Sequence, residues 1–400
     1  MSDFESDVPN IPDHTLAQKQ HLLPHVSAEE QKTLVMEILA AVSAHSMAPY
    51  YKHLTSELPQ FFPYDDVKYT ELARANDARL AELRKAVADA EADDEPDLDL
   101  TAALTSLAEY YATIVDRSNA TDTYRRVLQH TQNTGAKIDV LLALARVDFF
   151  FSDYARVAKH LAEVEALIEK GGDWERRNRH KTYQGIYYMA TRNFADAARL
   201  LIDSLATFTS TELCTYEQVA QYAIVCGMLS LDRVDLKAKI VDLPEILAIY
   251  SSAKTLEPLI SLTNALYTCQ YSCLFQHLLD TNDRCFKRDK HLRAHASYFM
   301  REFRCKTYAQ LLESYKSLSL KFMARSFNVS EEFLDEDLCH FIPSGKINCT
   351  IDKINGVIET NRPNNKNSQY HLLLKLGDAL LTKLQKYGVA VKMSGTDRVS

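Results

Sequence analysis

A sequence repeat of forty residues is the feature that most constrains how this 400-residue chain can fold. The segment SDYARVAKHLAEV (152–164) aligns with RNFADAARLLIDS (192–204), and LDRVDLKAKIVD (231–242) follows after about forty more. A looser copy, SNATDTYRRVLQH (118–130), precedes them. A single unit of this length cannot bury its apolar face, whereas stacked neighbours can. The repeat therefore indicates stacked helical hairpins of the tetratricopeptide-like kind, in which stacking supplies the core.

Each unit is expected to contain a helix, a turn, and a second helix with alanine where its partner crosses closely. Tyr154 and Phe194 share one position of the alignment, and Val234 replaces the aromatic residue in the last copy. The alanines that coincide are Ala158, Ala198 and Ala238. Gly135 and Gly171-Gly172 lie between units, where the sequence predicts left-handed helix ends.

The N-terminal part is expected to contain an arm followed by two helices. Residues 1–28 are polar, contain three prolines and are predicted to be extended. Ser27, with Glu30 three residues on, predicts a capping box at the start of a helix that ends before Pro49. A second, highly charged helix is expected over 67–92. It ends in the acidic run 89–99. Because acids oppose the dipole at a helix C-terminus, this run is interpreted as a boundary.

Residues 318–360 have the pattern of a winged helix. A helix is expected over 318–326, Asn328-Val329 makes a tight turn, and Ser330 caps a second helix. The buried side of that second helix is expected to comprise Phe333, Leu334, Leu338, Phe341 and Ile342. After Pro343, Ile347, Cys349 and Ile351 alternate on one face of a strand, and Asn355-Gly356 predicts a two-residue hairpin turn. The returning strand, 357–360, is expected to be a free edge that another chain can extend.

The second helix of this motif carries too many acids for it to read DNA. Glu331, Glu332, Asp335, Glu336 and Asp337 occupy it with no basic residue among them. A helix in the major groove offers cations and amides to bases and phosphates. Because carboxylates repel phosphates, the winged helix is expected to bind or pack against protein instead.

A leucine-rich helix is expected at the C-terminal end, from about Ser368 to Tyr387, after the polar spacer NNKNS. Its apolar residues follow a heptad-like 3-4-4-3 spacing: Leu373, Leu376, Leu380, Leu384 and Tyr387. The helix can pack on its own domain or enter a bundle with other chains, and the flexible spacer favours the bundle.

Composition and charge limit the compartment and the partners. The net charge of −8 is almost entirely due to residues 89–99, which carry seven acids, so the rest of the chain offers no basic surface for nucleic acid or anionic membrane. The N-terminus lacks a secretory signal, and no run of eighteen apolar residues is present to span a bilayer. Eight cysteines from Cys214 to Cys349 are expected to be reduced thiols, which predicts a location in cytoplasm and nucleus.

The sequence contains no convincing catalytic, cofactor or metal site. It lacks a phosphate-binding GxxxxGK[ST] loop, a GxSxG elbow and an HExxH helix, so we expect no enzyme, no cofactor and no catalytic residue. Cys269, Cys273 and His277 could line one helix face, and His291 and His295 form another i, i+4 pair. Small buried thiols between helices are commoner than structural zinc with such spacing, so no metal is expected. Cys339 and Cys349 are expected in the core of the wing.

Helical repeats that run into a winged helix resemble the PCI architecture of large scaffold complexes. Three segments are similar to one family of non-ATPase subunits of the proteasome lid, numbered seven in yeast and six in mammals: GGDWERRNRHKTYQGIYYMATRNFADAA (171–198), YAQLLESYKSLSLKFMARSFNVSEEFLDEDL (308–338) and KINCTIDKINGVIETNRPNNKNSQY (346–370). The similarity extends from about residue 100 to residue 390. It implies an all-α solenoid followed by a winged-helix (PCI) module with a small β-hairpin and a C-terminal helix.

The resemblance also implies partners and an interface. Such a chain would be a structural subunit that supports ATP-dependent degradation of ubiquitinated proteins, in contact with other PCI and MPN subunits and indirectly with the ATPase ring and core particle. Nucleic acid and membrane are not among the expected partners. The predicted subunit interface comprises Lys346, Ile351, Val357 and Ile358 in the wing and Leu373, Leu376, Leu380 and Leu384 in the final helix.

The expected domain boundaries and the alternatives follow from the same reading. We expect an N-terminal arm and helices over 1–96, repeats over 97–212, a PCI domain over 213–362 with its winged helix from 318, and a spacer and bundle helix over 363–400. A homologous subunit of the COP9 signalosome remains an alternative at this stage. A nucleic-acid-binding winged-helix protein and an enzyme are further alternatives that the residues favour less.

Overall fold

The computed structural model describes residues 9–92, 98–252, 255–361 and 365–396. The chain divides into two compact units, residues 1–304 and 305–400. A long helix, α16 (Ala296–Ser314), begins in the first unit and continues into the second. The acidic boundary predicted over 89–99 lies partly outside the described residues.

The N-terminal unit begins with three helices, and the expectation of an extended arm over residues 1–28 is wrong. Asp13 caps α1 (His14–Leu22) by accepting a hydrogen bond from the amide of Thr15. Leu16 and Ala17 of this helix are buried in an apolar cluster shared with α2 (Ala28–Ala44) and α3 (Ala48–Glu57). The sequence pattern missed α1 because a short helix that buries two adjacent residues has no apolar periodicity.

One detail of this region also differs from expectation. Ser27 is the N-cap residue of α2 as predicted, but its side chain makes no capping hydrogen bond. The helix ends before Pro49 as expected, at Ala44, and Pro49 lies in the first turn of α3, where the missing amide hydrogen costs nothing.

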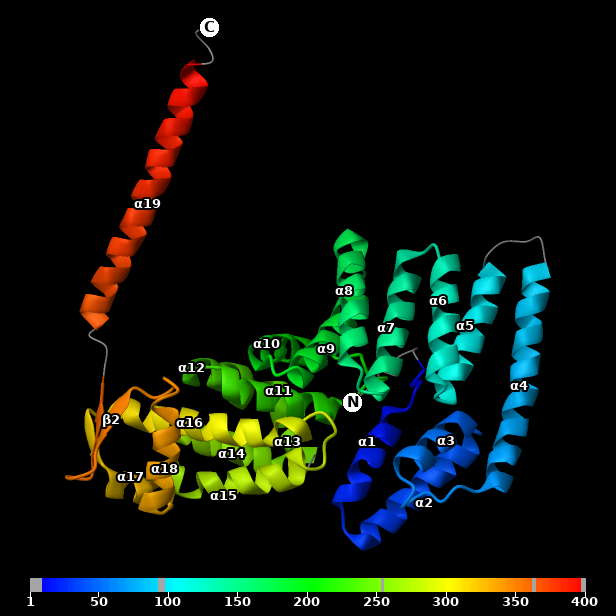
Figure 1. The fold of residues 1–400 in the computed structure, drawn as a ribbon, viewed down its shortest axis with the longest axis horizontal. Helices are drawn as coiled ribbons and strands as arrows, with labels where there is room; N and C mark the ends of the chain where they lie inside the picture. The colour runs from blue at the N-terminus through cyan, green and yellow to red at the C-terminus, as the bar shows by residue number, and fades with distance from the viewer. Residues whose placement is uncertain (1–8, 93–97, 253–254, 362–364, 397–400) are drawn as a thin grey trace. The chain divides into compact units, whose positions relative to one another are not determined.

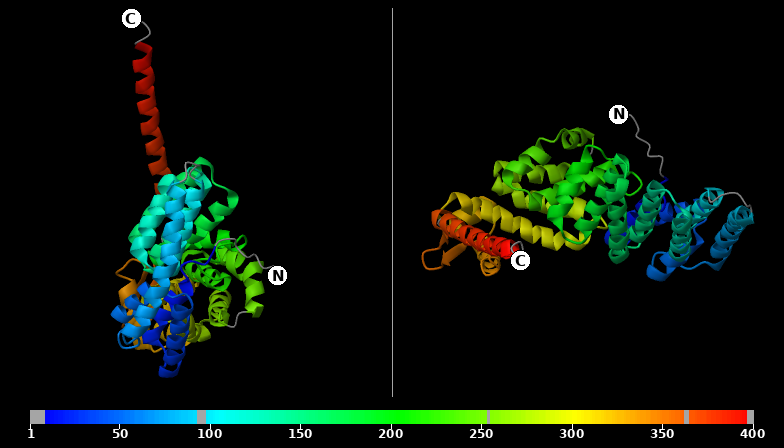
Figure 2. Two further views of the ribbon diagram at one scale, coloured as in Figure 1. Left: turned by 90° about the vertical axis from the view of Figure 1, so that its right-hand side faces the viewer. Right: turned by 90° about the horizontal axis from the view of Figure 1, so that it is seen from above.

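Helical hairpins form the rest of the N-terminal unit, as the repeat predicts. From α4 to α11, consecutive helices pack against each other, and α4 to α8 lie side by side in Figure 1 and in the right-hand view of Figure 2. These elements are α4 (Asp66–Ala92), α5 (Leu98–Thr113), α6 (Arg117–His130), α7 (Thr134–Phe150), α8 (Tyr154–Gly171), α9 (Trp174–Ala190), α10 (Phe194–Leu205), α11 (Tyr216–Ser230), α12 (Arg233–Leu236), α13 (Pro244–Ser252), α14 (Glu257–Thr268) and α15 (Tyr271–Thr281). A single large apolar core runs through them.

The hairpins reverse at residues in the left-handed conformation that are not glycines. Six such residues have φ between 52° and 67°: Ser46, Val115, Ser152, Arg192, Cys269 and Asn328. Each one follows the end of a helix, and the next amide donates to the carbonyl five residues earlier at 2.8–3.0 Å. For example, the amide of Asp153 donates to Asp148 and that of Asn193 to Tyr188. This bond is the long one of the Schellman motif, which satisfies helix-end carbonyls and reverses the chain.

The glycines predicted at left-handed helix ends are only partly confirmed. Gly171 is the last residue of α8 and Gly172 its C-cap, but Gly171 has φ of 145°, outside the left-handed helical region, and Gly135 lies within the first turn of α7. Glycine instead sits where two helices touch: a Cβ added to Gly185 of α9 would lie 2.8 Å from the side chain of Leu201, and one added to Gly227 of α11 would overlap Ile240.

The alanines predicted at the helix crossings are only partly confirmed. Ala198 is buried in α10, Ala158 is half-buried, and Ala238 is exposed. The third copy of the repeat forms only α12 and a short π-helical turn, Lys237–Val241, so its register differs from that of the other copies.

The C-terminal unit contains the predicted winged helix. Its elements are β1 (Ser317–Ser319), α17 (Leu320–Phe327), α18 (Glu331–Phe341), β2 (Cys349–Asp352), β3 (Val357–Thr360) and the terminal helix α19 (Asn365–Thr396). Ser330 caps α18 by accepting from the amide of Phe333, and Leu334, Leu338 and Phe341 are buried as expected. Tyr308 of α16 is fully buried among them and donates to Asp337 of α18 at 3.2 Å.

The strands of the wing differ from expectation in three respects. Leu318 lies in strand β1 and not in a helix. The sheet order is β1-β3-β2, with both pairs antiparallel, so the returning strand β3 is central and the free edges are β1 and β2. The hairpin loop has four residues, 353–356, because Asp352 pairs with Val357; Gly356 alone is left-handed. The third strand, β1, lies some forty residues before its partner β3, and local patterns could not reveal this pairing.

We predict that Ser152→Gly stabilises the protein, because glycine relieves the left-handed strain at this hairpin turn. The free energy of unfolding in urea should rise by about 0.5–1 kcal/mol. The matched control is Ala162→Gly on the exposed side of α8, which should lower it by about 1 kcal/mol. A Ser152→Gly variant as destabilised as the control would show that the turn carries no strain.

Candidate functional site

A cluster of buried titratable groups lies where α1 meets residues 289–291. Asp289 accepts hydrogen bonds from the Tyr222 hydroxyl at 2.7 Å and from the amides of His291 and Leu292 at 2.8 and 3.0 Å. The Lys290 ammonium donates to the carbonyls of Phe149 and Phe150, at 3.3 and 2.6 Å, at the C-terminal end of α7. This arrangement joins separate helices of the N-terminal unit through main-chain and side-chain hydrogen bonds.

Burial keeps the histidine side chains of this junction uncharged. Burial lowers the pKa of Lys290 to about 8 and that of His291 to about 3, and it places the pKa of His14 well below its ordinary value. The His291 ring lies 3.2 Å from the Tyr154 hydroxyl through Nδ1. Both histidines are therefore neutral at physiological pH and act as packed polar side chains.

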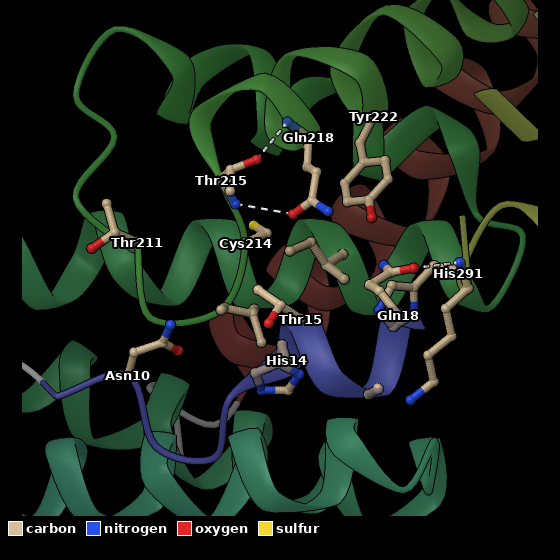
Figure 3. Close-up of a pocket in the computed structure, with 14 residues that line it drawn as sticks. Asn10, His14, Thr15, Gln18, Thr211, Cys214, Thr215, Gln218, Tyr222 and His291 are labelled. Carbon is tan, nitrogen blue, oxygen red and sulfur yellow. Dashed lines mark hydrogen bonds between the residues drawn. The ribbon is translucent and has the colours of Figure 1, made fainter. Parts of the chain in front are cut away.

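The cavity on the α11 side of this junction is too small for a substrate. It has a volume of about 60 Å³ and lies between α1, α11 and the loop that ends at Cys214 (Figure 3). Residues on its wall include His14, Gln18, Cys214 and Tyr222. Sites for small-molecule ligands have volumes of roughly 300–1,000 Å³. We therefore interpret the junction as structural.

The residues that sequence patterns marked as possible metal ligands are not brought together. Cys269 is the left-handed residue after α14, whereas Cys273 and His277 belong to α15, so the three do not line one helix. His295 binds the Ala190 carbonyl through Nε2 and accepts from Arg192 through Nδ1, both at 3.0 Å. Within the described ranges, no group of three His, Cys, Asp or Glu side chains is placed to hold a metal ion. Nor does any described helix have the length and apolarity to cross a membrane.

The acids of α18 are distributed over three environments. Glu331 and Glu332 lie exposed in the first turn, where the helix dipole favours them. Asp335 accepts from Lys353 of the wing at 2.8 Å, and Asp337 is buried against Tyr308. The helix face that would enter a DNA groove therefore presents carboxylates and no base, which opposes binding to phosphates.

The tip of the hairpin is the most exposed apolar point of the winged helix. Ile354 is 95% exposed. The loop that presents it is held by Asp352, which accepts from the amides of Ile354 and Asn355 and from the Asn355 side chain. Sequence reasoning missed this residue because it assigned the turn to Asn355-Gly356. An apolar residue fixed at a loop tip has the form of an anchor for a partner pocket.

The predicted wing residues occupy unequal positions. Lys346 is exposed, and Ile351 and Val357 are half-buried. Ile358 is fully buried in the central strand and has no surface to offer. Phe333 and Cys339, which were expected in the core, are exposed on α18, while Cys349 is buried.

The terminal helix is longer than expected and exposed along its length. It starts at Asn365, within the predicted spacer, and runs for 32 residues. All described side chains from 366 to 393 are exposed. The four predicted interface leucines, Leu373, Leu376, Leu380 and Leu384, are among them. Exposed apolar surface of this extent is typical of protein interaction sites.

Comparisons with known proteins point to one kind of complex. The model of the family described as "26S proteasome subunit RPN7" matches residues 65–239, and that of the PCI domain matches residues 279–362. The chain is 48% identical to the 26S proteasome regulatory subunit RPN7 of Saccharomyces cerevisiae, over 98% of this chain and 96% of that protein. It is 44% identical to rpn7 of Schizosaccharomyces pombe, over 94% of each chain. The identity to the 26S proteasome non-ATPase regulatory subunit 6 homolog of Arabidopsis thaliana is 38%, over 93% of this chain and 95% of that one.

The buried His291 predicts a specific loss of stability in acid. Its folded-state pKa, about 3, lies below the ordinary value of 6.5, so the unfolded chain binds the proton first as the pH falls. The stability due to the neutral ring is therefore complete above pH 6.5 and is lost as the pH falls toward 3. Between pH 7 and pH 5, this one residue should lower the free energy of unfolding by about 2 kcal/mol.

Urea unfolding of the wild type and of His291→Gln at both pH values, followed by circular dichroism, tests this. The variant should be less stable at pH 7 yet lose about 2 kcal/mol less on acidification. If the wild type and the variant lose the same free energy of unfolding between pH 7 and pH 5, His291 is accessible to protons in the folded chain.

Proposed function

The chain belongs to the family of the 26S proteasome regulatory subunit RPN7, and from that premise we propose that it is a non-catalytic scaffold of the lid of the regulatory particle. In this role it supports ATP-dependent degradation of ubiquitinated proteins by holding other subunits in place. Its partners are other PCI and MPN subunits of the lid, and through them the ATPase ring and the core particle. The cytoplasm and the nucleus are the compartments that this role requires.

The exposed apolar surface of α19 is the observation that carries the proposal. Leu373, Leu376, Leu380 and Leu384 are each at least 59% exposed, on one helix. Burying a leucine side chain stabilises an assembly by roughly 1.5–3 kcal/mol, so four of them supply a strong drive toward a helical bundle. The expected bundle helix within 363–400 is thus assigned to assembly.

The wing is proposed as the second contact. Lys346, Ile351 and Val357 remain candidates there, and Ile354 joins them, whereas Ile358 supports the sheet from inside. The free edges β1 and β2 can pair with a neighbouring chain, because edge strands have main-chain groups available for hydrogen bonds. The PCI domain proposed over 213–362 combines this module with the preceding helices.

The alternatives have less support. The relatives named above are proteasome subunits, and no feature of the structure favours a COP9 signalosome subunit. The acidic surface of α18 argues against duplex binding.

Deletion of residues 365–400 is predicted to abolish assembly without unfolding the rest of the chain, because the side chains of α19 are exposed. Circular dichroism melting should give an unchanged midpoint for the shortened protein. Co-expression with the other lid subunits and purification through one of them should recover little of it. Truncation after residue 396 keeps α19 and is the control. Normal recovery of the shortened chain would refute the bundle role.

Ile354→Asp should weaken assembly while leaving the fold intact, since the side chain is almost fully exposed. Loss of one apolar anchor corresponds to about 2 kcal/mol, or roughly a thirtyfold loss of affinity for the neighbour. Recovery with co-expressed subunits in a dilution series measures it. Asn348→Asp adds the same charge to an exposed site of the same hairpin and should assemble normally. Equal behaviour of both variants would rule out an anchor at the tip.

A further inference from the structure

The terminal helix contains its own sequence repeat, with a period of eleven residues. LLKLGDALLTK (373–383) aligns with LQKYGVAVKMS (384–394). Identical residues occupy four positions: Leu373 and Leu384, Lys375 and Lys386, Gly377 and Gly388, Ala379 and Ala390. The 3-4-4-3 spacing, described above as heptad-like, therefore belongs to a pattern that repeats every eleven residues and not every seven.

This period determines the path of the apolar stripe, which we call the seam. The seam follows the spacing 3-4-4-3-4 and consists of Leu373, Leu376, Leu380, Leu384, Tyr387 and Val391. Eleven residues complete three turns at 3.67 residues per turn, close to the 3.6 of a straight helix but on the opposite side from the 3.5 of heptads. A heptad seam winds to the left, whereas this one drifts slightly to the right. Over the two copies, about 33 Å, the seam is almost straight.

The two equivalent glycines lie beside the seam. At about 100° per residue, Gly377 and Gly388 each lie about 65–70° from the centre of the three seam residues of their own copy. A Cβ added to either glycine would meet no heavy atom within 4 Å. The seam residues are between 51% and 70% exposed. Each interior glycine costs about 1 kcal/mol of helix stability relative to alanine, and nothing within the chain fills the space that the pair leaves open. The pair leaves room for a second backbone to come close.

Charge selects the kind of partner. Residues 366–393 contain five lysines and one acid, Asp378. Lys383 borders the seam on the side opposite the glycines, about 70° from its centre line, whereas Lys386 lies on the far side of the helix. A second copy of this chain would bring the same excess of lysines, which is unfavourable. A helix with acidic side chains beside its own apolar stripe would be attracted instead.

We propose that α19 packs lengthwise, in a straight or weakly right-handed pair, against an acidic-flanked helix of a different subunit. The partner backbone comes closest at Gly377 and Gly388, and its carboxylates face Lys383. This inference rests on the proposed role in lid assembly. It adds how α19 packs and the charge of the partner helix that packs against it.

Filling the two glycine positions tests the geometry. In the full chain, Gly377→Leu with Gly388→Leu should reduce recovery with co-expressed lid subunits at least tenfold. Ala379→Leu with Ala390→Leu is the matched control: it places the same bulk at the same eleven-residue spacing, on the lysine side and away from the seam. Its recovery should stay within twofold of the wild type. Because leucine favours helix more than glycine does, a loss cannot come from unfolding of α19.

The charge of the partner is tested by Lys383→Glu, with Lys386→Glu on the far side of the helix as the control. Recovery should fall severalfold at low salt, and the difference from the wild type should shrink at 0.5 M salt, because exposed charges are screened. Sedimentation of the isolated wild-type chain should show a monomer. A dimer that is lost in the glycine double variant would overturn the proposal, since α19 would then pair with its own copy. Unchanged or increased recovery on charge reversal would overturn the acidic partner.

Failure of this inference is distinguishable from failure of the proposed function. If deletion of residues 365–400 prevents assembly but the glycine double variant assembles normally, α19 is needed and the close approach is wrong. If the deletion itself assembles normally, the bundle role fails and the close approach fails with it.

Discussion

The fold depends on one recurring hydrogen bond at helix ends, made by the amide that follows a left-handed residue. The amide after each of these residues donates to the carbonyl five positions earlier, at Asp116, Asp153, Asn193 and Gln270 in the hairpins and at Val329 in the winged helix. The same geometry therefore reverses the chain in the solenoid and sets the turn between α17 and α18. A left-handed residue with a side chain costs roughly 1–2 kcal/mol, and the carbonyls it satisfies, together with packing of the two helices, offset that cost.

Rigid packing in the N-terminal unit contrasts with exposed apolar surface in the C-terminal unit. In the first, buried polar side chains form internal hydrogen bonds, as Asp289 does with Tyr222 and two amides. In the second, Ile354 and the seam of α19 remain in water. A protein whose titratable cluster is buried and whose apolar side chains are exposed is suited to binding other chains. This division explains why no catalytic constellation is needed for the function proposed for it.

Periodicity predicted most of the helices and the winged helix, but not the features set by distant contacts. The forty-residue repeat located α6, α8 and α10, and Ser330 located the start of α18. The prediction for residues 1–28 was wrong because α1 is stabilised by burial against α2 and α3, which a local pattern cannot show. The predicted free edge at 357–360 was wrong because β1 adds to it from forty residues away. Glycine was expected at the helix ends, where side chains such as those of Ser152 and Arg192 are tolerated instead.

The sequence by itself determined the class of fold, the acidic face of α18, the family resemblance and the apolar stripe of the last helix. These depend on the order of residue types along the chain, which periodicity and charge report directly. Only the tertiary structure decided that Ile358 is internal, that Ile354 projects from a braced loop, and that Gly185 and Gly227 are contact points between helices. The physical reason is that burial and close approach belong to pairs of segments, and a single stretch of sequence contains only one member of each pair.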